Sequence, residues 1–196
     1  MASGRLIYLI GPSGAGKDTL LWEASRRLSH RGNVRFPRRV ITRPRDQRGD
    51  DVRELYEWAD EARFRSREMH GDFLVTWRSH GLAYGLPGSI REDLADRRDV
   101  VVNGSRGALD RARAAVERIQ PVYIWADANT LAQRLRQRGR EDEADIEHRI
   151  ARGSAYAIPQ DAAVIDNSGS LDDAIGALCR ILGPTCDDAT ANGRFA

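Results

Sequence analysis

Lysine is nearly absent from this sequence. Of its 31 lysine and arginine residues, Lys17 is the only lysine. An arginine-rich genome accounts for the general absence, but it does not account for where the one lysine stands, directly after a glycine-rich segment. A compact ammonium group suits a phosphate site there better than a planar guanidinium does. Lys17 is therefore the first candidate functional residue.

Cysteines and long apolar runs are also scarce. Cys179 and Cys186 lie near the C-terminus without motif spacing, so we expect a reducing compartment and no disulfide framework. No apolar run approaches 18 residues, and the first residues lack the basic and long apolar segments of a signal peptide. These absences predict a cytoplasmic protein with no membrane partner.

The chain has little excess of charge of either sign. Its 31 basic and 29 acidic residues leave a net charge of +2, which is too small to indicate nucleic acid as a partner. The four histidines have no metal-ligand spacing. A length of 196 residues suits one domain with a full core. We expect a small-molecule substrate, and the oligomeric state stays open, a homodimer included.

A phosphate-binding loop follows the first apolar run. Residues 6–10 lead directly into GPSGAGK, which fits G-x-x-x-x-G-K, and an amphipathic helical pattern comes next. Glycines let such a loop wrap around an anion, with N–H groups and a helix N-terminus pointing inward. The residues predicted to bind ATP here are Gly11, Pro12, Ser13, Gly14, Ala15, Gly16, Lys17, Asp18 and Thr19.

The position after the lysine departs from the usual pattern. It is normally Ser or Thr, whose hydroxyl binds Mg²⁺, but here it is Asp18, with Thr19 next. A carboxylate is also a good ligand for Mg²⁺, so both residues are candidate metal ligands. The alternative for Asp18 is an acidic residue favoured in the first turn of a helix.

Strand and helix patterns alternate along the chain. We expect strands at 6–10, 36–41, 73–77, 100–102, 121–126 and 162–165, a turn at 81–85, and helices at 19–30, 61–69 (N-cap Asp60), 89–96, 108–119, 129–138, 141–152 and 171–182. This alternation predicts an α/β fold whose parallel central sheet has helices on both faces. We predict one three-layer P-loop kinase domain over 1–183, with an inserted acceptor-binding lobe at about 35–90 and a disordered tail at 184–196.

Arginines are concentrated at the start of that lobe. Six of them lie within fourteen residues, at positions 35, 38, 39, 43, 45 and 48. Arginine forks that converge suit a polyanionic substrate. The alternative is a solvated basic face.

Three short motifs resemble the acceptor side of guanylate kinases: Thr42-Arg43-Pro44-Arg45, Tyr56-Glu57-Trp58 and Tyr84-Gly85. The resemblance implies that Arg43, Arg45, Tyr56 and Tyr84 hold the phosphate of the acceptor. Alternatively, the two tyrosines only pack within the lobe.

The resemblance fails where guanylate kinases recognise the base. Val75 stands in place of their guanine-binding glutamate, and Asn103 and Ser105 replace an acidic pair. Guanine's donors would be buried unpaired against Val75, at roughly 1–3 kcal/mol each. A guanine nucleotide is therefore a poor candidate acceptor.

A second resemblance covers about residues 5–182. GPSGAGKD, Ile41-Thr42-Arg43, His80-Gly81-Leu82 and Asn103-Gly104-Ser105-Arg106 are similar to the ribose 1,5-bisphosphate phosphokinase family of phosphonate breakdown, although residues 46–58 are longer than expected. This implies phosphoryl transfer from ATP, with Mg²⁺, to ribose 1,5-bisphosphate, giving 5-phosphoribosyl 1-diphosphate, with Asn103 and Ser105 binding the acceptor. The alternatives are a nucleoside monophosphate (guanylate-like) kinase and a non-catalytic guanylate-kinase-like module, whose P-loop would be degraded.

A third stretch resembles the lid of nucleoside monophosphate kinases. Arg134 and Arg138 are four residues apart, so they share a helix face, and Gly139 and later Arg149 follow. The resemblance implies a mobile lid at about 134–152 whose catalytic residues are Arg134, Arg138 and Arg149. It also places Asn167 beside adenine. For the arginines, the alternative is a solvated helix with Glu–Arg pairs. For Asn167, the alternative is an ordinary turn asparagine.

Overall fold

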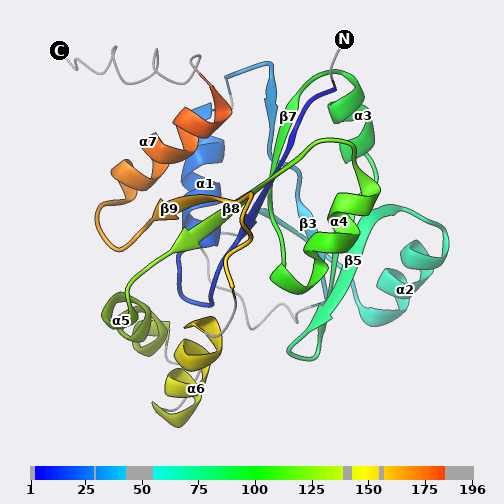
Figure 1. The fold of residues 1–196 in the computed structure, drawn as a ribbon. Coiled ribbons are helices and arrows are strands. Elements are labelled where there is room, and N and C mark those ends of the chain that lie inside the picture. The colour runs from blue at the N-terminus through cyan, green and yellow to red at the C-terminus, as the bar shows by residue number, and fades with distance from the viewer. Residues whose placement is uncertain (1–2, 29, 43–54, 139–142, 155–156, 184–196) are drawn as a thin grey trace.

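The central sheet is built around the first apolar run. A computed structural model describes residues 3–28, 30–42, 55–138, 143–154 and 157–183. The sheet has five parallel strands in the order β2 (Val34–Arg35), β7 (Asp99–Asn103), β1 (Leu6–Ile10), β8 (Ile119–Trp125) and β9 (Ala163–Asp166). The predicted α/β class with a parallel sheet is confirmed (Figure 1).

Helices cover both faces of this sheet because its central strands are apolar on both sides. Ile7 and Leu9 of β1 pack with α1 (Lys17–Leu28) and α7 (Leu171–Leu182). Leu6 and Tyr8 face the other way, toward α3 (Ile90–Ala95) and α4 (Leu109–Ala115), which the short 3-10 helix η3 (Arg106–Ala108) precedes. Alternate side chains of a strand point to opposite faces, so one strand supports two core layers.

A second sheet lies within residues 35–90, where the sequence predicts an inserted lobe. Its order is β4 (Tyr56–Trp58), β3 (Arg39–Ile41), β6 (Leu82–Pro87) and β5 (Phe73–Ser79), and β3 pairs parallel with β4 and antiparallel with β6. Val40 on one face packs with Phe64 of α2 (Glu61–Met69), whereas Ile41 on the other face joins the core beneath α3 and α4. The lobe thus shares one of its faces with the central domain.

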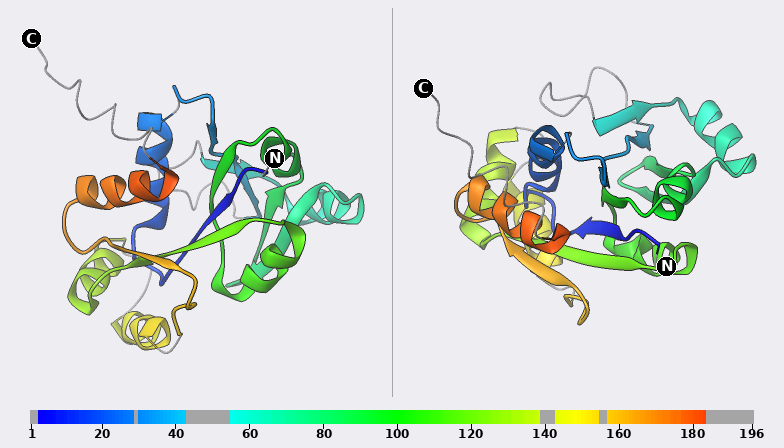
Figure 2. Two further views of the ribbon diagram at one scale, coloured as in Figure 1. Left: turned by 45° about the horizontal axis from the view of Figure 1, so that its top comes forward. Right: turned by 90° about the horizontal axis from the view of Figure 1, so that it is seen from above.

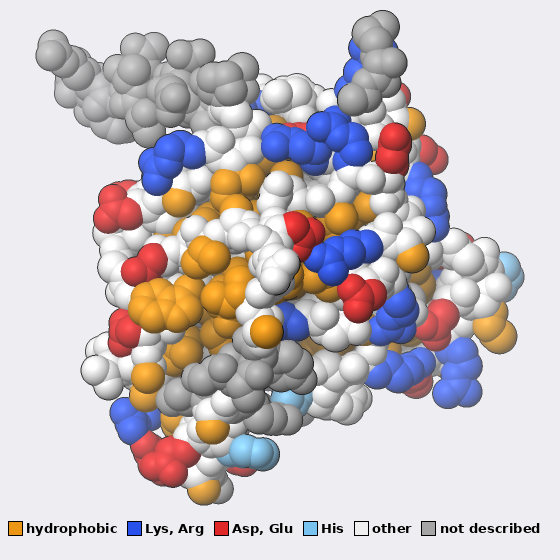
Figure 3. Space-filling view, viewed as in Figure 1, with side chains coloured by type: hydrophobic (Ala, Val, Ile, Leu, Met, Phe, Trp, Pro, Cys, Tyr) orange, Lys and Arg blue, Asp and Glu red, His pale blue; other side chains and the backbone are white. Residues whose placement is uncertain are grey.

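The helices α5 (Ala128–Arg138) and α6 (Glu143–Ser154) pack together beyond the end of β8. They lie on the side of the molecule away from α2 (Figures 1 and 2). Nearby, Trp125 and Val164 leave an exposed apolar area on the face of β8 and β9 opposite α1 and α7 (Figure 3). None of the described helices is both long and apolar enough to span a bilayer.

Several predicted elements are confirmed, and three are wrong in detail. The strand at 6–10, the helix at 171–182 and the Asp60 cap of α2 agree with the structure. The strand expected at 36–41 begins only at Arg39, as β3, and β2 ends just before the expected range and belongs to the other sheet. Pro37, which has no N–H for a ladder, lies between them. The predicted tail at 184–196 lies outside the described residues.

The turn expected at 81–85 and the helix expected at 108–119 are the other corrections. His80 and Gly81 alone form the turn, with φ of 51° and 72°, and β6 begins at Leu82. Gly85 is a strand residue, where a Cβ would lie 2.6 Å from the Phe73 ring. The helix α4 already ends at Ala115, because the chain turns extended to enter β8.

Candidate active site

The glycine-rich loop is held tightly against its surroundings. Gly11, Gly14 and Gly16 have φ of 148°, 87° and 82°, values that strain any residue with a Cβ. A Cβ on Gly11 would lie 2.3 Å from the Ile124 carbonyl oxygen, and one on Gly16 would lie 2.4 Å from Nδ2 of Asn167. The loop is therefore a close-fitting cradle that only glycine permits at these positions.

Lys17 sits at the opening of this cradle as the first residue of α1. Its Nζ donates hydrogen bonds to the carbonyl oxygens of Gly11, at 3.0 Å, and Pro12, at 2.8 Å. The positive end of α1 adds to the charge of the ammonium group. The arrangement offers a phosphate both backbone N–H groups and a point charge.

Asp18 lies at the centre of a polar network. Asn103 Nδ2 donates to Asp18 Oδ1, the Tyr56 hydroxyl hydrogen-bonds the same carboxylate, and Arg39 Nη2 is 3.9 Å from Oδ1. Burial alone would raise the pKa of Asp18, but the charge of Arg39 and the bond from Tyr56 outweigh it. Lys17 and Asn103 act in the same direction, so the pKa lies below its ordinary value and the group is ionised at neutral pH.

Arg39 closes this network from the lobe. Its side chain is 11% exposed, Nη1 donates to the Asn103 carbonyl at 3.1 Å and Nη2 to the Tyr56 hydroxyl at 3.4 Å. Its Cζ lies 5.2, 5.7 and 5.0 Å from the ring centroids of Tyr56, Trp77 and Tyr84. These distances allow cation–π attraction to each ring. A cation is thus fixed between three aromatic residues and the end of β7.

Sequence reasoning did not single out Arg39 from the six neighbouring arginines. Strand alternation carries the missing signal, because Arg39 and the fully apolar Ile41 share one face of β3. An arginine on a buried strand face must be paired or functional, since burying its charge is costly.

The acceptor residues implied by the resemblance lie partly in this network. Tyr56 is a member of it, and Tyr84 is buried and stacked on Trp77, with centroids 5.4 Å apart and rings 6° from parallel. Arg43 and Arg45 lie outside the described residues.

The turn after β7 is fixed by Tyr8. The Ser105 N–H donates to the Tyr8 hydroxyl at 3.0 Å, and that hydroxyl donates to the Ser105 carbonyl at 3.3 Å. A Cβ on Gly104 would come within 2.1 Å of the Tyr8 ring. Burial raises the pKa of Tyr8, so the hydroxyl keeps its proton. These contacts hold Asn103 in place against Asp18.

Arg134 and Asn167 meet behind the P-loop. Arg134 Nη2 donates to the Asn167 carbonyl at 2.9 Å, and Asn167 Nδ2 donates to the Ala15 carbonyl at 2.7 Å. Asn167 is only 3% exposed. Its amide nitrogen therefore supports the loop, and its contact with adenine stays a prediction.

The remaining predicted site residues are less defined. The side chains of Arg138 and Arg149 lie outside the described part of α5 and α6. Arg136 pairs with Glu143 across these helices, as the solvated-helix alternative expects for that residue. Thr19 is exposed on α1, whereas Asp18 faces the network.

Comparisons with known proteins agree on the family. The guanylate kinase family model matches residues 3–184. A Pseudomonas paraeruginosa protein named ribose 1,5-bisphosphate phosphokinase PhnN is 44% identical over 183 residues, which cover 92% of this chain and 96% of that protein. Its namesake from Rhizobium etli is 42% identical over 180 residues, covering 91% and 89%.

A solved structure supports the same fold. Guanylate kinase from Anaplasma phagocytophilum aligns with a TM-score of 0.64 and 19% identity, over 95% of this chain and 90% of that chain. The chain belongs to the guanylate kinase family by its domain, and by its relatives to the ribose 1,5-bisphosphate phosphokinase family.

Proposed function

We propose that this chain transfers the γ-phosphoryl group of ATP to the 1-phosphate of ribose 1,5-bisphosphate. The products are ADP and 5-phosphoribosyl 1-diphosphate. The observation that carries the proposal is the pairing of Asp18 with Asn103, which joins the P-loop to a residue standing where guanylate kinases carry an acidic group. The names of the relatives support the same acceptor.

The reaction requires no general base from the protein. An oxygen of the 1-phosphate forms a bond to the γ-phosphorus, and the bond from that phosphorus to the β,γ-bridging oxygen breaks, which releases ADP. A phosphate monoester has a second pKa of about 6, so the attacking group is already largely deprotonated at neutral pH. Catalysis then depends on alignment and on neutralising charge.

The loop and its lysine fit ATP. Gly11 and Gly16 let the loop pack against Ile124 and Asn167 without a clashing Cβ, and backbone N–H groups of such a loop bind β- and γ-phosphate oxygens. Lys17 Nζ exchanges its contacts with the loop carbonyls for these oxygens. Arg134 Nη2 donates to the Asn167 carbonyl behind the loop. We propose that Arg134, Arg138 and Arg149 are the lid arginines that meet the transferred phosphoryl group.

The charge beside the loop also fits Mg²⁺. An ionised carboxylate next to the P-loop lysine is a hard oxygen donor. Asp18 is one candidate ligand and the exposed Thr19 the other. When bound, Mg²⁺ neutralises charge on the β- and γ-phosphates.

The acceptor side suits a sugar phosphate better than a base. Val75 is buried and has no hydrogen-bonding group, Arg39 offers only donors, and the Asn103 amide nitrogen is bound to Asp18, so among these three side chains only the Asn103 Oδ1 can accept. Guanine presents N–H donors on its pairing edge, which require acceptors. The remaining arginine loop, with Arg43 and Arg45, then serves the second phosphate.

We further propose that the reaction takes place in the cytoplasm and serves phosphonate breakdown.

A panel of acceptors tests the proposal. Purified chain, ATP and Mg²⁺ are incubated with ribose 1,5-bisphosphate, ribose 5-phosphate, GMP, AMP, dTMP or gluconate, and the products are followed by phosphorus NMR. The bisphosphate should yield a diphosphate, and ribose 5-phosphate, which lacks the accepting group, should not react. The kcat/KM for the bisphosphate should exceed that for GMP by more than about a hundredfold, since GMP leaves charge-assisted contacts unmade. Phosphorylation of GMP as fast as that of the bisphosphate contradicts the proposal and favours a nucleotide kinase.

A further inference from the structure

Arg39 has more hydrogen-bonding capacity than its surroundings use. A guanidinium carries five N–H donors, and here Nη1 serves the Asn103 carbonyl and Nη2 the Tyr56 hydroxyl. Its Nε is buried and has no hydrogen-bond partner among the described residues. A buried charged donor without a partner is costly, and such a group is expected where a ligand or water supplies the acceptor.

Asn103 has the complementary feature, a buried acceptor without a hydrogen-bond partner among the described residues. It is 6% exposed, its Nδ2 is held by Asp18, and its Oδ1 is buried without a hydrogen-bond partner within the described part of the chain. Since Arg39 contacts Asn103 directly, an unsatisfied donor and an unsatisfied acceptor belong to adjoining residues. A phosphate oxygen satisfies the donor, and a sugar hydroxyl can satisfy either group. A phosphorylated sugar carries both.

The position of Arg39 is fixed before any ligand arrives. Three rings surround its guanidinium, and contacts to β7 and β4 hold its two terminal nitrogens. Little side-chain entropy then remains to be lost on binding, which favours affinity. The same fixed cation lies against Asn103, where it presents donors and no acceptor to a bound molecule.

We propose that Arg39 binds the sugar phosphate acceptor directly. This assignment rests on the proposed function and adds to it, because Arg39 lies in β3 and is not one of the residues that the family motifs assign to the acceptor. Its contact is with acceptor oxygens and depends on neither ATP nor Mg²⁺.

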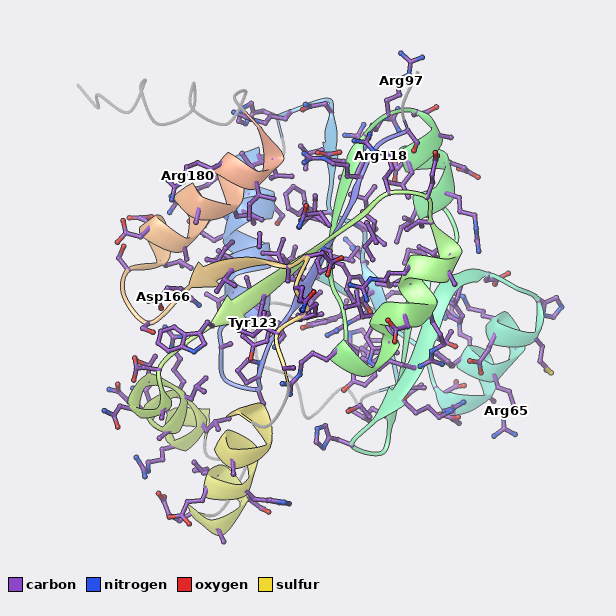
Figure 4. All side chains as sticks on the ribbon, viewed as in Figure 1. Arg65, Arg97, Arg118, Tyr123, Asp166 and Arg180 are labelled. Atoms are coloured by element: carbon purple, nitrogen blue, oxygen red, sulfur yellow. The ribbon has the colours of Figure 1, made fainter. Side chains whose placement is uncertain are left out.

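Binding of ribose 1,5-bisphosphate without nucleotide tests the assignment by calorimetry. Arg39→Met keeps the length of the side chain but removes its charge and donors, and Arg39→Lys keeps the charge but removes the fork. Arg65→Met is the matched control, since Arg65 lies on the same lobe and points from α2 into solvent (Figure 4). We expect Kd to rise about ten- to a hundredfold for Arg39→Met, and about tenfold for Arg39→Lys, with no change for Arg65→Met.

The outcomes separate this inference from the proposed function. Wild-type affinity for the bisphosphate in a folded Arg39→Met or Arg39→Lys variant overturns the assignment. A variant that loses turnover but keeps nucleotide-free binding also overturns it, because Arg39 then acts only through its contact with Asp18. If Arg39→Met does not fold, Arg39→Lys decides, because it leaves the cation within the aromatic cluster. Weakened binding in the variants, together with a wild-type chain that binds the bisphosphate but does not phosphorylate it, rejects the function and supports the site. A wild-type chain that does not bind the bisphosphate rejects both.

Discussion

Asn103 donates its side-chain amide to the carboxylate of Asp18, 85 residues away in the chain. One residue ends β7 and the other lies in the first turn of α1, so the bond joins the nucleotide loop to the strand end that borders the lobe. Because a carboxylate only accepts, the amide nitrogen of Asn103 must face it and the amide oxygen must face elsewhere. The bond therefore fixes both the rotamer and the orientation of Asn103.

The first prediction changes the charge of this pair. Asn103→Asp keeps the shape of the side chain but sets two carboxylates against each other. We expect the free energy of unfolding at pH 8 to fall by roughly 2 kcal/mol, with much of the loss recovered at pH 5 as the pair takes up a proton. Thermal melts of the variant and the wild type across this range measure the effect. A variant whose deficit does not depend on pH speaks against contact between the two carboxylates.

Acid titration examines Asp18 itself. Its pKa is lower in the folded chain than in the unfolded one, so the unfolded state binds the proton more readily. The stabilisation from the ionised group is complete above the ordinary aspartate pKa of about 3.9 and is lost as the pH falls toward the folded-state pKa. We expect Asp18→Asn to be less stable than the wild type at pH 7, with the gap closing below about pH 4. Denaturant unfolding at a series of pH values tests this, and a gap that widens in acid has the wrong sign.

A third prediction concerns Lys17. Its Nζ lies 3.0 and 2.8 Å from two loop carbonyls, a space that fits a compact ammonium but not a guanidinium. We expect Lys17→Arg to keep the thermal stability of the wild type and to lose activity by orders of magnitude. Steady-state kinetics and a melting curve suffice. Near wild-type turnover means that the loop does not hold the transferred phosphate.

Gly16→Ala should affect both stability and nucleotide binding. The glycine has φ of 82°, and a Cβ would lie 2.4 Å from Asn167 Nδ2. Gly71→Ala is the matched control, because Gly71 has φ of 75° but open space around a Cβ. We expect both variants to lose about 1 kcal/mol to backbone strain, and Gly16→Ala to lose clearly more and to bind ATP poorly. Equal losses in denaturant unfolding argue against the contact with Asn167.

The sequence predicts the local parts of this molecule well. The strand, loop and start of the helix around Lys17 are a local pattern, and so are the apolar runs of β1 and β7 and the cap at Asp60. The separation of β2 from β3 is harder to predict, because Arg35 and Arg39 lie in different sheets although only four positions apart. Tertiary packing decides which sheet each strand joins, and local periodicity carries no information about that packing.

The candidate site is likewise predictable from the sequence only in part. Asp18 and Asn103 each stand out in the sequence as departures from a familiar motif, but nothing local pairs them, because their contact depends on the order of strands in the sheet. Arg39 resembles its five arginine neighbours until the fold buries one face of β3. The hydrogen bond from Asn167 to the Ala15 carbonyl also depends on the tertiary fold, because Asn167 follows β9 and β9 pairs with β8.

The last prediction separates two arginines of the same helix. Arg134 holds the Asn167 carbonyl at the back of the P-loop, so Arg134→Ala should loosen the loop itself and raise KM for ATP as well as lower kcat. Arg138 lies one turn further along α5 and is predicted to meet the phosphoryl group as its charge redistributes. A contact that strengthens only in the transition state contributes to kcat and not to ground-state binding. We therefore expect Arg138→Ala to lower kcat by about ten- to a hundredfold with little change in KM for ATP. Saturation kinetics of both variants distinguish the roles, and a change confined to KM in Arg138→Ala makes it a ground-state binder of ATP.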